Sequence, residues 1–388
     1  MHITLIAGAR PNFMKIAPLI KAIKEHNELA DERISGLGEK ISYRLVHTGQ
    51  HYDKNMSDTF FEELGIPAPN VNLGCGGGTQ AEQTAAIMVA FEKELMAHPA
   101  DIVLVVGDVT STMACSIVAK KLNTKVCHVE AGIRSWDLTM PEEINRMVTD
   151  SLADYMFTTS EVANANLLRQ GAEMNKNVWF VGNVMIDTLL ANRARFRKPQ
   201  IWDELGLKEK QYIVMTMHRP GNVDEESHLK AMMEQIITNV RGLPIVFPIH
   251  PRTALRLREL LNERSQTSSM SAIESLNDAN KWANLHIVEP MGYLEFNYLV
   301  ERAKAVVTDS GGITEETTVM GVPCITLRDN TERPETCTVG TNELIGTDPK
   351  AIKPAMDKLF AGEWKKGAIP ELWDGHTAAR IIEILARL

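Results

Sequence analysis

Short apolar runs alternate with helix-patterned segments in the first half of the chain. The runs are rich in branched apolar residues, which is typical of buried strands. They occupy residues 2–7, 43–48, 102–106, 126–129, 155–158 and 178–181. Between them, apolar residues recur at helical spacing, as at Ile16, Leu19, Ile20 and Ile23. Such alternation predicts a parallel sheet with helices on both faces.

A second alternation of the same kind begins near Tyr212. Its strand-like runs occupy residues 212–217, 245–249, 285–288, 305–308 and 324–327. Residues 196–210 are mixed and polar, as in a linker, and the serine-rich residues 265–281 are typical of a surface insertion. A chain of 388 residues also exceeds one ordinary hydrophobic core. We therefore predict an α/β protein with two doubly wound Rossmann-like domains, residues 1–190 and 200–375, facing a central cleft.

The charge balance and the cysteines exclude several classes of protein. Fifty acidic and 41 basic side chains leave a formal charge of −9, which argues against a nucleic-acid or anionic-membrane surface. No apolar run is long enough to span a membrane. The five cysteines form no CxxC pair, so we expect no metal site. Scattered thiols and an N-terminal segment that is typical of a strand, not of a signal peptide, favour a cytoplasmic protein.

The first predicted strand is followed by two cations that flank a turn. Arg10 and Lys15 lie on either side of Pro11, which is a favourable residue for opening a helix. A helix N-terminus attracts anions, so the turn is either an anion site or a capped loop with solvated cations. The segment lacks G-x-G-x-x-G, and we therefore expect no dinucleotide cofactor.

Three carboxylates follow strands or open a helix in the first domain. Asp108 and Glu130 lie at predicted strand ends, and Glu142 lies at the start of a predicted helix. The apolar face of that helix is predicted to be Ile144, Met147, Val148 and Leu152. Carboxylates that converge on one rim raise one another's proton affinity, which suits acid/base catalysis. The alternative is that Asp108 and Glu142 only cap helices.

In the second domain, polar residues that suit a nucleotide follow the strands. His218 and His250 end two of them and are plausible phosphate ligands. Residues 307–316 place Ser310, Gly311 and Gly312 between a buried strand and a helix, where backbone N–H groups can approach a diphosphate. Glu316, about one turn further on, is able to accept hydrogen bonds from both ribose hydroxyls. The alternative is a flexible strand-to-helix turn without a ligand.

Nine ordered motifs carry a resemblance to a known family. They are GARPNFMK, TGQHYD, GDVTST, HVEAGIRS, MPEEINR, FVGNVMID, HRPGNVD, DSGGITEE and TERPE. Together they resemble the non-hydrolysing UDP-N-acetylglucosamine 2-epimerases, from the first strand to about Gly346. The resemblance implies the GT-B fold, with residues 376–388 returning to the N-terminal domain, and a homodimer. It also implies elimination and re-addition of UDP through a 2-acetamidoglucal, with no cofactor.

The resemblance also implies a role for each candidate residue. Asp108, Glu130 and Glu142 would be the acid/base groups, and Lys15 would orient the sugar and the carboxylates. Contacts to the diphosphate would come from Arg10, His218, Ser310, Gly311 and Gly312. Of the remaining residues, Glu316 would bind the ribose, Phe296 the uracil and Arg333 the substrate.

Two of the chain's departures from the family pattern bear on its function. Pro220 and Gly221 follow His218-Arg219 where the family often has Glu. Near Gln50, no Arg in residues 76–83 matches the set that binds a second, activating substrate molecule in some members, which argues against such activation. Three alternatives stay open: an epimerase for UDP-2,3-diacetamido-glucuronate, a GT-B glycosyltransferase, and a UDP-sugar sensor without turnover.

Overall fold

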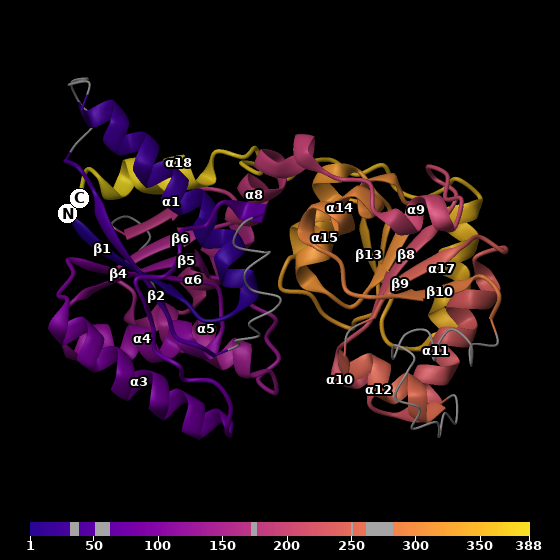
Figure 1. Ribbon diagram of the computed structural model, residues 1–388, viewed down its shortest axis with the longest axis horizontal. Coiled ribbons are helices and arrows are strands. Elements are labelled where there is room, and N and C mark those ends of the chain that lie inside the picture. Colours follow the sequence, from indigo (N-terminus) through magenta and orange to yellow (C-terminus); the bar gives the residue numbers. More distant parts are fainter. Residues whose placement is uncertain (32–38, 51–62, 172–176, 250, 261–281) are drawn as a thin grey trace. The chain divides into compact units, whose positions relative to one another are not determined.

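The described part of the chain forms two compact units, each with its own parallel sheet (Figure 1). The computed structural model describes residues 1–31, 39–50, 63–171, 177–249, 251–260 and 282–388. Unit 1 comprises Met1–Asn192 and Glu371–Leu388, and unit 2 comprises Arg193–Pro370. The predicted insertion at 265–281 and the candidate His250 lie outside the described residues.

In unit 1, seven described strands form a parallel sheet in the order β3-β2-β1-β4-β5-β6-β7. They are β1 (His2–Ala7), β2 (Ser42–His47), β3 (Val71–Asn72), β4 (Ile102–Val106), β5 (Lys125–Ala131), β6 (Tyr155–Thr158) and β7 (Val178–Phe180). The described helices are α1 (Arg10–Asp31), α3 (Gln80–Ala97), α4 (Thr110–Lys121), α5 (Pro141–Leu152), α6 (Glu161–Arg169), α8 (Val184–Asn192) and α18 (Thr377–Leu385). Figure 1 shows α1 and α18 on one face of the sheet and α3 and α4 on the other.

In unit 2, six described strands form a parallel sheet in the order β10-β9-β8-β11-β12-β13. They are β8 (Ile213–Thr216), β9 (Ile245–Pro248), β10 (Leu285–Val288), β11 (Ala305–Thr308), β12 (Cys324–Thr326) and β13 (Asn342–Leu344). The described helices are η1 (Arg193–Arg195), α9 (Gln200–Glu204), α10 (Pro220–Val223), α11 (Glu226–Asn239), α12 (Pro251–Leu260), α14 (Tyr293–Arg302), α15 (Gly311–Met320), α16 (Pro334–Thr338), η2 (Pro349–Ala351) and α17 (Ile352–Phe360).

The central strands are buried on both faces because helices cover both sides of each sheet. In β8, Ile213 and Met215 pack with α11 and α17, whereas Val214 packs on the opposite face with α14. Side chains alternate across a strand, so a run that is apolar throughout is the pattern of a strand buried on both faces. The predicted fold class of two doubly wound α/β domains is therefore confirmed.

Two strands and one helix differ from the sequence predictions. β3 has two residues and β13 has three, with two polar residues, so neither gives a recognisable apolar run. The segment expected as a linker contains α9 and packs on unit 2, where the Trp202 ring lies 5.6 Å from that of Tyr212. Among the described residues, no helix has the length and apolarity that crossing a bilayer requires.

The C-terminal helix α18 returns to unit 1, as predicted, and packs against α1 and α8. Its first two backbone N–H groups donate to the buried Asp187 carboxylate of α8, Thr377 at 3.1 Å and Ala378 at 2.6 Å. Unsatisfied N–H groups at a helix start need such acceptors. Asp187 thus caps a helix that begins 190 residues further along the chain.

We predict that Asp187→Ala destabilises unit 1 by about 1–3 kcal/mol, because two buried N–H donors lose their acceptor. Thermal and urea unfolding measure the change. The control is Glu383→Ala on the exposed side of α18, which is expected to stay within about 0.5 kcal/mol of the parent. Equal stability of the two variants would rule out the capping role.

Candidate active site

In unit 1, the switch in strand order lies between β1 and β4, and Asn12 ties the ends of these two strands together. Its side-chain oxygen accepts from the backbone N–H groups of Gly8, at 3.1 Å, and Ala9, at 2.9 Å. Its amide donates to the carbonyl of Val106 at 2.9 Å. In open parallel sheets, ligands bind beyond the carboxyl ends of the strands at such a switch point. Asn12 therefore fixes the edge at which the candidate residues Lys15, Asp108 and Glu130 lie.

Lys15 and Glu130 form a nearly buried ion pair at this edge. The ammonium of Lys15 lies 2.6 Å from Oε2 of Glu130, whose side chain is 3% exposed. Glu130 has a φ of +72° at a bulge between Val129 and Ala131 in β5. Bulges and left-handed residues other than glycine commonly re-aim a side chain at functional sites, at a cost in strain. The structure thus brings these two candidate residues together.

Gly107 lies against the same ion pair. A Cβ atom at this position would lie 3.2 Å from Nζ of Lys15 and 3.6 Å from Oε2 of Glu130, and the φ of Gly107 is +70°. Any side chain here would therefore be strained and would press on the pair. Gly107 also carries the turn that leads directly into Asp108, so it couples the position of Asp108 to that of Lys15 and Glu130.

Asp108 is held by α5 through Arg146 and Asn145. Arg146 forms a short ion pair with Oδ2 of Asp108 and donates to Glu143 at 2.8 Å. The amide of Asn145 donates to the carbonyl of Asp108 at 2.8 Å. Glu143 is fully buried and also accepts from Ser135 and Trp136. Asp108 is thus a carboxylate held in a fixed orientation, with its side chain still about a third exposed.

The predicted apolar face of α5 is wrong. The residues that this helix buries are polar: Glu143, Asn145, Arg146, Thr149 and Asp150. Ile144, predicted inside, is exposed. A charged face can be buried where every charge is paired, and here the acidic and basic groups on the helix serve one another and the loop 107–108. Sequence reasoning missed Glu143 and Arg146, although their i, i+3 spacing was a signal for an ion pair.

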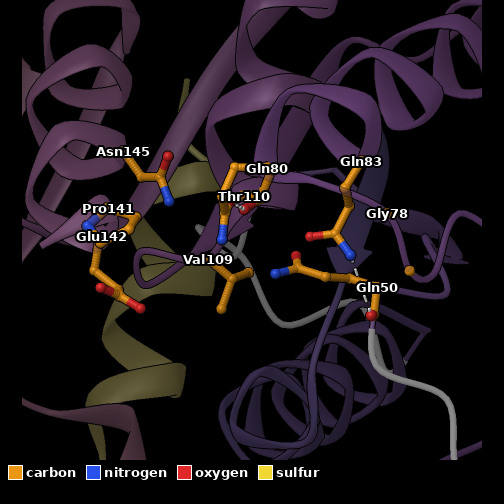
Figure 2. Close-up of a pocket in the computed structure, with 10 residues that line it drawn as sticks. Gln50, Gly78, Gln80, Gln83, Val109, Thr110, Pro141, Glu142 and Asn145 are labelled. Carbon is orange, nitrogen blue, oxygen red and sulfur yellow. Dashed lines mark hydrogen bonds between the residues drawn. The ribbon is translucent and has the colours of Figure 1, made fainter. Parts of the chain in front are cut away.

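Glu142 lines a cavity of about 500 Å³ in unit 1 (Figure 2). Figure 2 shows Pro141, Glu142 and Asn145 at one end of it and Gln50, Gln83 and Gly78 at the other, with Thr110 and Gln80 between them. Glu142 is exposed, at the first turn of α5, where a helix N-terminus favours a carboxylate. Asn145 belongs both to this cavity and to the support of Asp108.

Below the edge, a buried histidine and aspartate connect β4, β5 and α5. His128 lies 2.6 Å from Asp150 through Nδ1 and 2.8 Å from the carbonyl of Gly107 through Nε2. The ring thus links α5 to the residue that follows β4. Asp150 also accepts from Arg134 at 2.6 Å. Burial acts to raise the pKa of Asp150, but His128 and Arg134 outweigh it and hold the pKa below its usual value.

In unit 2, the switch in strand order lies between β8 and β11, and Asp309 organises it. Its buried carboxylate accepts from the backbone N–H groups of His218, at 3.0 Å, and Arg219, at 2.8 Å. It also lies 2.8 Å from Nδ1 of His218 and accepts from Asn222 at 3.2 Å. Burial acts to raise the pKa of Asp309, but these partners, His218 foremost, hold it below its usual value. We expected Asp309 within the segment that grips the nucleotide, and the structure shows it oriented toward His218.

The N-terminal turn of α15 lies beside Asp309. Ser310, Gly311 and Gly312 are partly exposed, and Ser310 donates its backbone N–H to Thr308 at 2.9 Å. The first N–H groups of a helix have no partner within the helix, so this ten-residue helix presents donors suited to an anion. Close by, Arg328 forms a two-point ion pair with Glu332, both contacts being 2.8 Å.

The remaining candidates are placed as follows. Glu316 is buried in α15, and burial raises its pKa to about 7. Phe296 is partly buried on α14. Arg333 is buried and forms a short ion pair with Glu315. Arg10 is the first residue of α1, and its side chain lies outside the described part of the structure. No group of three His, Cys, Asp or Glu side chains among the described residues is arranged to hold a metal ion.

Comparison with known proteins links this arrangement to one family. A family model described as UDP-N-acetylglucosamine 2-epimerase matches residues 37–386. A UDP-N-acetylglucosamine 2-epimerase from Methanocaldococcus jannaschii is 39% identical over 99% of both chains. A UDP-2,3-diacetamido-2,3-dideoxy-D-glucuronate 2-epimerase from Pseudomonas aeruginosa is 36% identical over 100% of both. The crystal structure of a Methanocaldococcus jannaschii UDP-GlcNAc 2-epimerase in complex with UDP-GlcNAc and UDP has a TM-score of 0.83, at 37% identity and 100% coverage of both chains.

We predict that Asp150→Asn lowers the free energy of unfolding by about 3–5 kcal/mol, because Arg134 and His128 lose a buried counter-charge. The folded-state pKa of Asp150 lies below its unfolded value. Its stabilising contribution is therefore complete above the unfolded pKa and is lost as the pH falls through the folded pKa. In urea unfolding, the variant and the parent should show the full difference in free energy of unfolding between about pH 5 and 8. The difference should be smaller at acidic pH.

The control for Asp150→Asn is Glu161→Gln at the exposed first turn of α6, with an expected change within about 0.5 kcal/mol. If the Asp150→Asn variant and the parent have nearly the same free energy of unfolding at neutral pH, Asp150 does not act as the buried partner of Arg134 and His128.

Proposed function

The chain belongs to the UDP-N-acetylglucosamine 2-epimerase family, and from this premise we propose that it interconverts UDP-N-acetylglucosamine and UDP-N-acetylmannosamine at carbon 2. The single observation that carries the proposal is the end-to-end match with relatives of that name, at 99% coverage of both chains. The fold, GT-B in this family, supplies two strand-end sites of complementary chemistry. Unit 1 presents carboxylates, and unit 2 presents a helix N-terminus with a histidine.

The proposed reaction has two halves that mirror one another. A base removes the proton on carbon 2, the electron pair of that bond forms the double bond to carbon 1, and UDP leaves with the electrons of its bond to carbon 1. The resulting 2-acetamidoglucal is then protonated at carbon 2 on the other face while UDP adds back to carbon 1. Because no ketone adjoins carbon 2, its proton is weakly acidic, so stabilising the departing diphosphate is the main demand.

In unit 1, Asp108, Glu130 and Glu142 are the proposed acid/base groups. Support comes from their surroundings: Arg146 holds Asp108, Lys15 holds Glu130, and Glu142 lines a cavity. Lys15 is the proposed positioning group for Glu130. Two carboxylates that are clamped by different cations can serve opposite faces of one sugar without exchanging protons with each other.

In unit 2, the N-terminal turn of α15 is the proposed site of the diphosphate. Ser310, Gly311 and Gly312 would supply backbone N–H groups, and His218 would stabilise the leaving oxygens. Glu316 would bind the ribose. Phe296 is proposed for the uracil, while Arg10 and Arg333 are proposed for further substrate contacts. Arg333 is buried and paired with Glu315, so the simplest role for Arg333 is an indirect one through this ion pair.

A second candidate substrate is the 2,3-diacetamido-glucuronate form of the UDP-sugar. It is favoured by the Pseudomonas aeruginosa relative, whose similarity also spans the full chain. Both substrates need the same chemistry at carbon 2, and they differ in the groups at carbons 3 and 6. We further propose that the protein is a cytoplasmic homodimer. Its five cysteines are not paired in disulfides, which supports the proposed compartment. Light scattering of the purified protein tests the dimer.

We predict that the enzyme incorporates one deuterium at carbon 2 when it turns over UDP-N-acetylglucosamine in deuterated water. The label marks the proton that is removed and replaced, and mass spectrometry detects it. Asp108→Asn and Glu130→Gln should each lower the rate of exchange by about 10²- to 10⁴-fold, the usual contribution of a general acid or base. Binding of UDP should be kept, because the proposed diphosphate site lies in unit 2.

The same assay with the diacetamido-glucuronate sugar separates the two substrates. Asp101→Asn in unit 1, a carboxylate that accepts from the backbone of His2, is the control and should retain activity. If neither sugar gains deuterium although UDP binds, the epimerase proposal fails and a sugar-nucleotide sensor or transferase is left.

We predict that Asp309→Asn lowers kcat on the order of 100-fold. The new amide turns an NH₂ group toward N–H groups that now donate to the carboxylate, and His218 is therefore misoriented. His218→Gln should lose activity as well. The double variant should lose no more than the single His218 variant, because the two residues act as a unit. Asp348→Asn, an exposed carboxylate that also accepts a backbone N–H group, is the matched control. Fully additive losses would contradict the positioning role of Asp309.

A further inference from the structure

Asn297 is a buried amide without a hydrogen bond of normal geometry. Its side chain lies on α14 with an exposed fraction of 0%, and neither polar atom has a partner among the described residues. Burying such a group unsatisfied opposes folding, and native proteins keep few of them. An unsatisfied amide in a packed helix contact therefore calls for a functional explanation.

Tyr293 and Asn297 lie one turn apart on α14 and both act on the carboxyl of Glu316 on α15. Side chains four residues apart share one face of a helix. Both residues act on the pKa of Glu316, which places the Tyr293 hydroxyl and the Asn297 amide next to its carboxyl. Oε1 of Glu316 is itself buried without a well-formed hydrogen bond in the described structure. The three polar side chains are thus buried together, and Oε1 of Glu316 can accept a further hydrogen bond.

Burial and the neighbouring polar groups together set the pKa of Glu316. Burial raises the pKa of Glu316 to about 7; the Tyr293 hydroxyl and the Asn297 amide oppose this rise, and the neighbouring Glu315 adds to it. Glu315 is paired with Arg333, and Glu335 of α16 lies near both. Near neutral pH, the carboxyl is therefore close to half ionised, and a ligand that donates hydrogen bonds to it favours the ionised form.

We propose that Tyr293 and Asn297 are positioning residues that hold Glu316 to accept hydrogen bonds from the ribose hydroxyls, so that the site selects ribonucleotides against 2′-deoxyribonucleotides. The proposal rests on the proposed function, because it places the diphosphate at the N-terminus of the same helix. Vicinal hydroxyls supply donors to Oε1 of Glu316, which is buried without a well-formed hydrogen bond in the described structure. Removing one hydroxyl leaves a buried acceptor unpaired, which weakens binding by about 10- to 100-fold.

The test compares the dissociation constants of UDP and 2′-deoxy-UDP by calorimetry. The ratio of the two constants cancels the contributions of the phosphates and of His218, so it reports on the hydroxyl alone. The parent should discriminate about 10- to 100-fold. Tyr293→Phe and Asn297→Leu, which nearly preserve side-chain size, should each reduce the ratio several-fold, and Glu316→Gln should bring it close to one. Tyr298→Phe, on the same helix but packed against Trp202 and Arg302, is the control and should leave it unchanged.

The pH dependence of this ratio separates positioning from a merely structural role. Discrimination needs the ionised carboxylate, so the ratio should rise as the pH increases through about 7. Without the Tyr293 hydroxyl or the Asn297 amide, which lower the pKa of Glu316, the midpoint of this rise should move to higher pH. A residue that only fills space would leave the midpoint in place.

Thermal melting shows whether the variants fold. Tyr293→Phe and Asn297→Leu should each keep a cooperative melting transition, which shows that a changed ratio does not come from unfolding. Failure of the parent to bind UDP would overturn the proposed function itself. Binding of UDP with the same ratio and the same midpoint in the parent, the Tyr293→Phe variant and the Asn297→Leu variant would leave the proposed function intact and overturn this inference.

Discussion

The constraint on which the candidate site depends is that each charge buried at a strand end needs a partner. Parallel sheets bring polar residues to their carboxyl edges, where helices on both faces exclude much of the water. An ionised group there is tolerated only if opposite charges or N–H donors replace the lost hydration. Glu130 has Lys15, Asp108 has Arg146, and Asp309 has two backbone N–H groups and His218. These partners determine how the three carboxylates are oriented.

The same requirement makes the two sites rigid before any ligand arrives. Fixed dipoles and charges stabilise a developing charge without reorganising at the moment of reaction. In unit 1, rigidity comes from the chain of contacts that runs from Glu143 through Arg146 to Asp108. In unit 2, it comes from Asp309, whose carboxylate holds the turn that carries His218. Because the buried face of α5 is polar, this helix contributes little hydrophobic burial, and its ion pairs fix the position of Asp108 instead.

The sequence predicts the two sheets, and it fails where burial decides between neighbours. Apolar runs identify strands that are buried on both faces, and the polar residues at or just after the ends of these runs mark the candidate site, as at Asp108 and Glu130. The pattern does not tell which of Glu142 and Glu143 turns inward, because an apolar reading of α5 places Ile144 inside and the ion pairs place it outside. Similarly, β13 is too short and polar to leave a periodic signal. Asp309 was grouped with the residues around it by proximity in the chain, whereas its contacts lie about 90 residues away.

Two aspartate–histidine pairs in the structure show how exposure separates a structural role from a reactive one. Asp150 and His128 lie 2.6 Å apart, and Asp309 and His218 lie 2.8 Å apart, so the pairing is nearly the same. His128 is completely buried and its second ring nitrogen is bound to the carbonyl of Gly107, so it cannot exchange a proton with a ligand. The ring of His218 is 43% exposed, at the edge of a sheet and beside a helix N-terminus. The same pairing thus stabilises a turn in unit 1 and leaves an exposed imidazole in unit 2, beside the proposed diphosphate site.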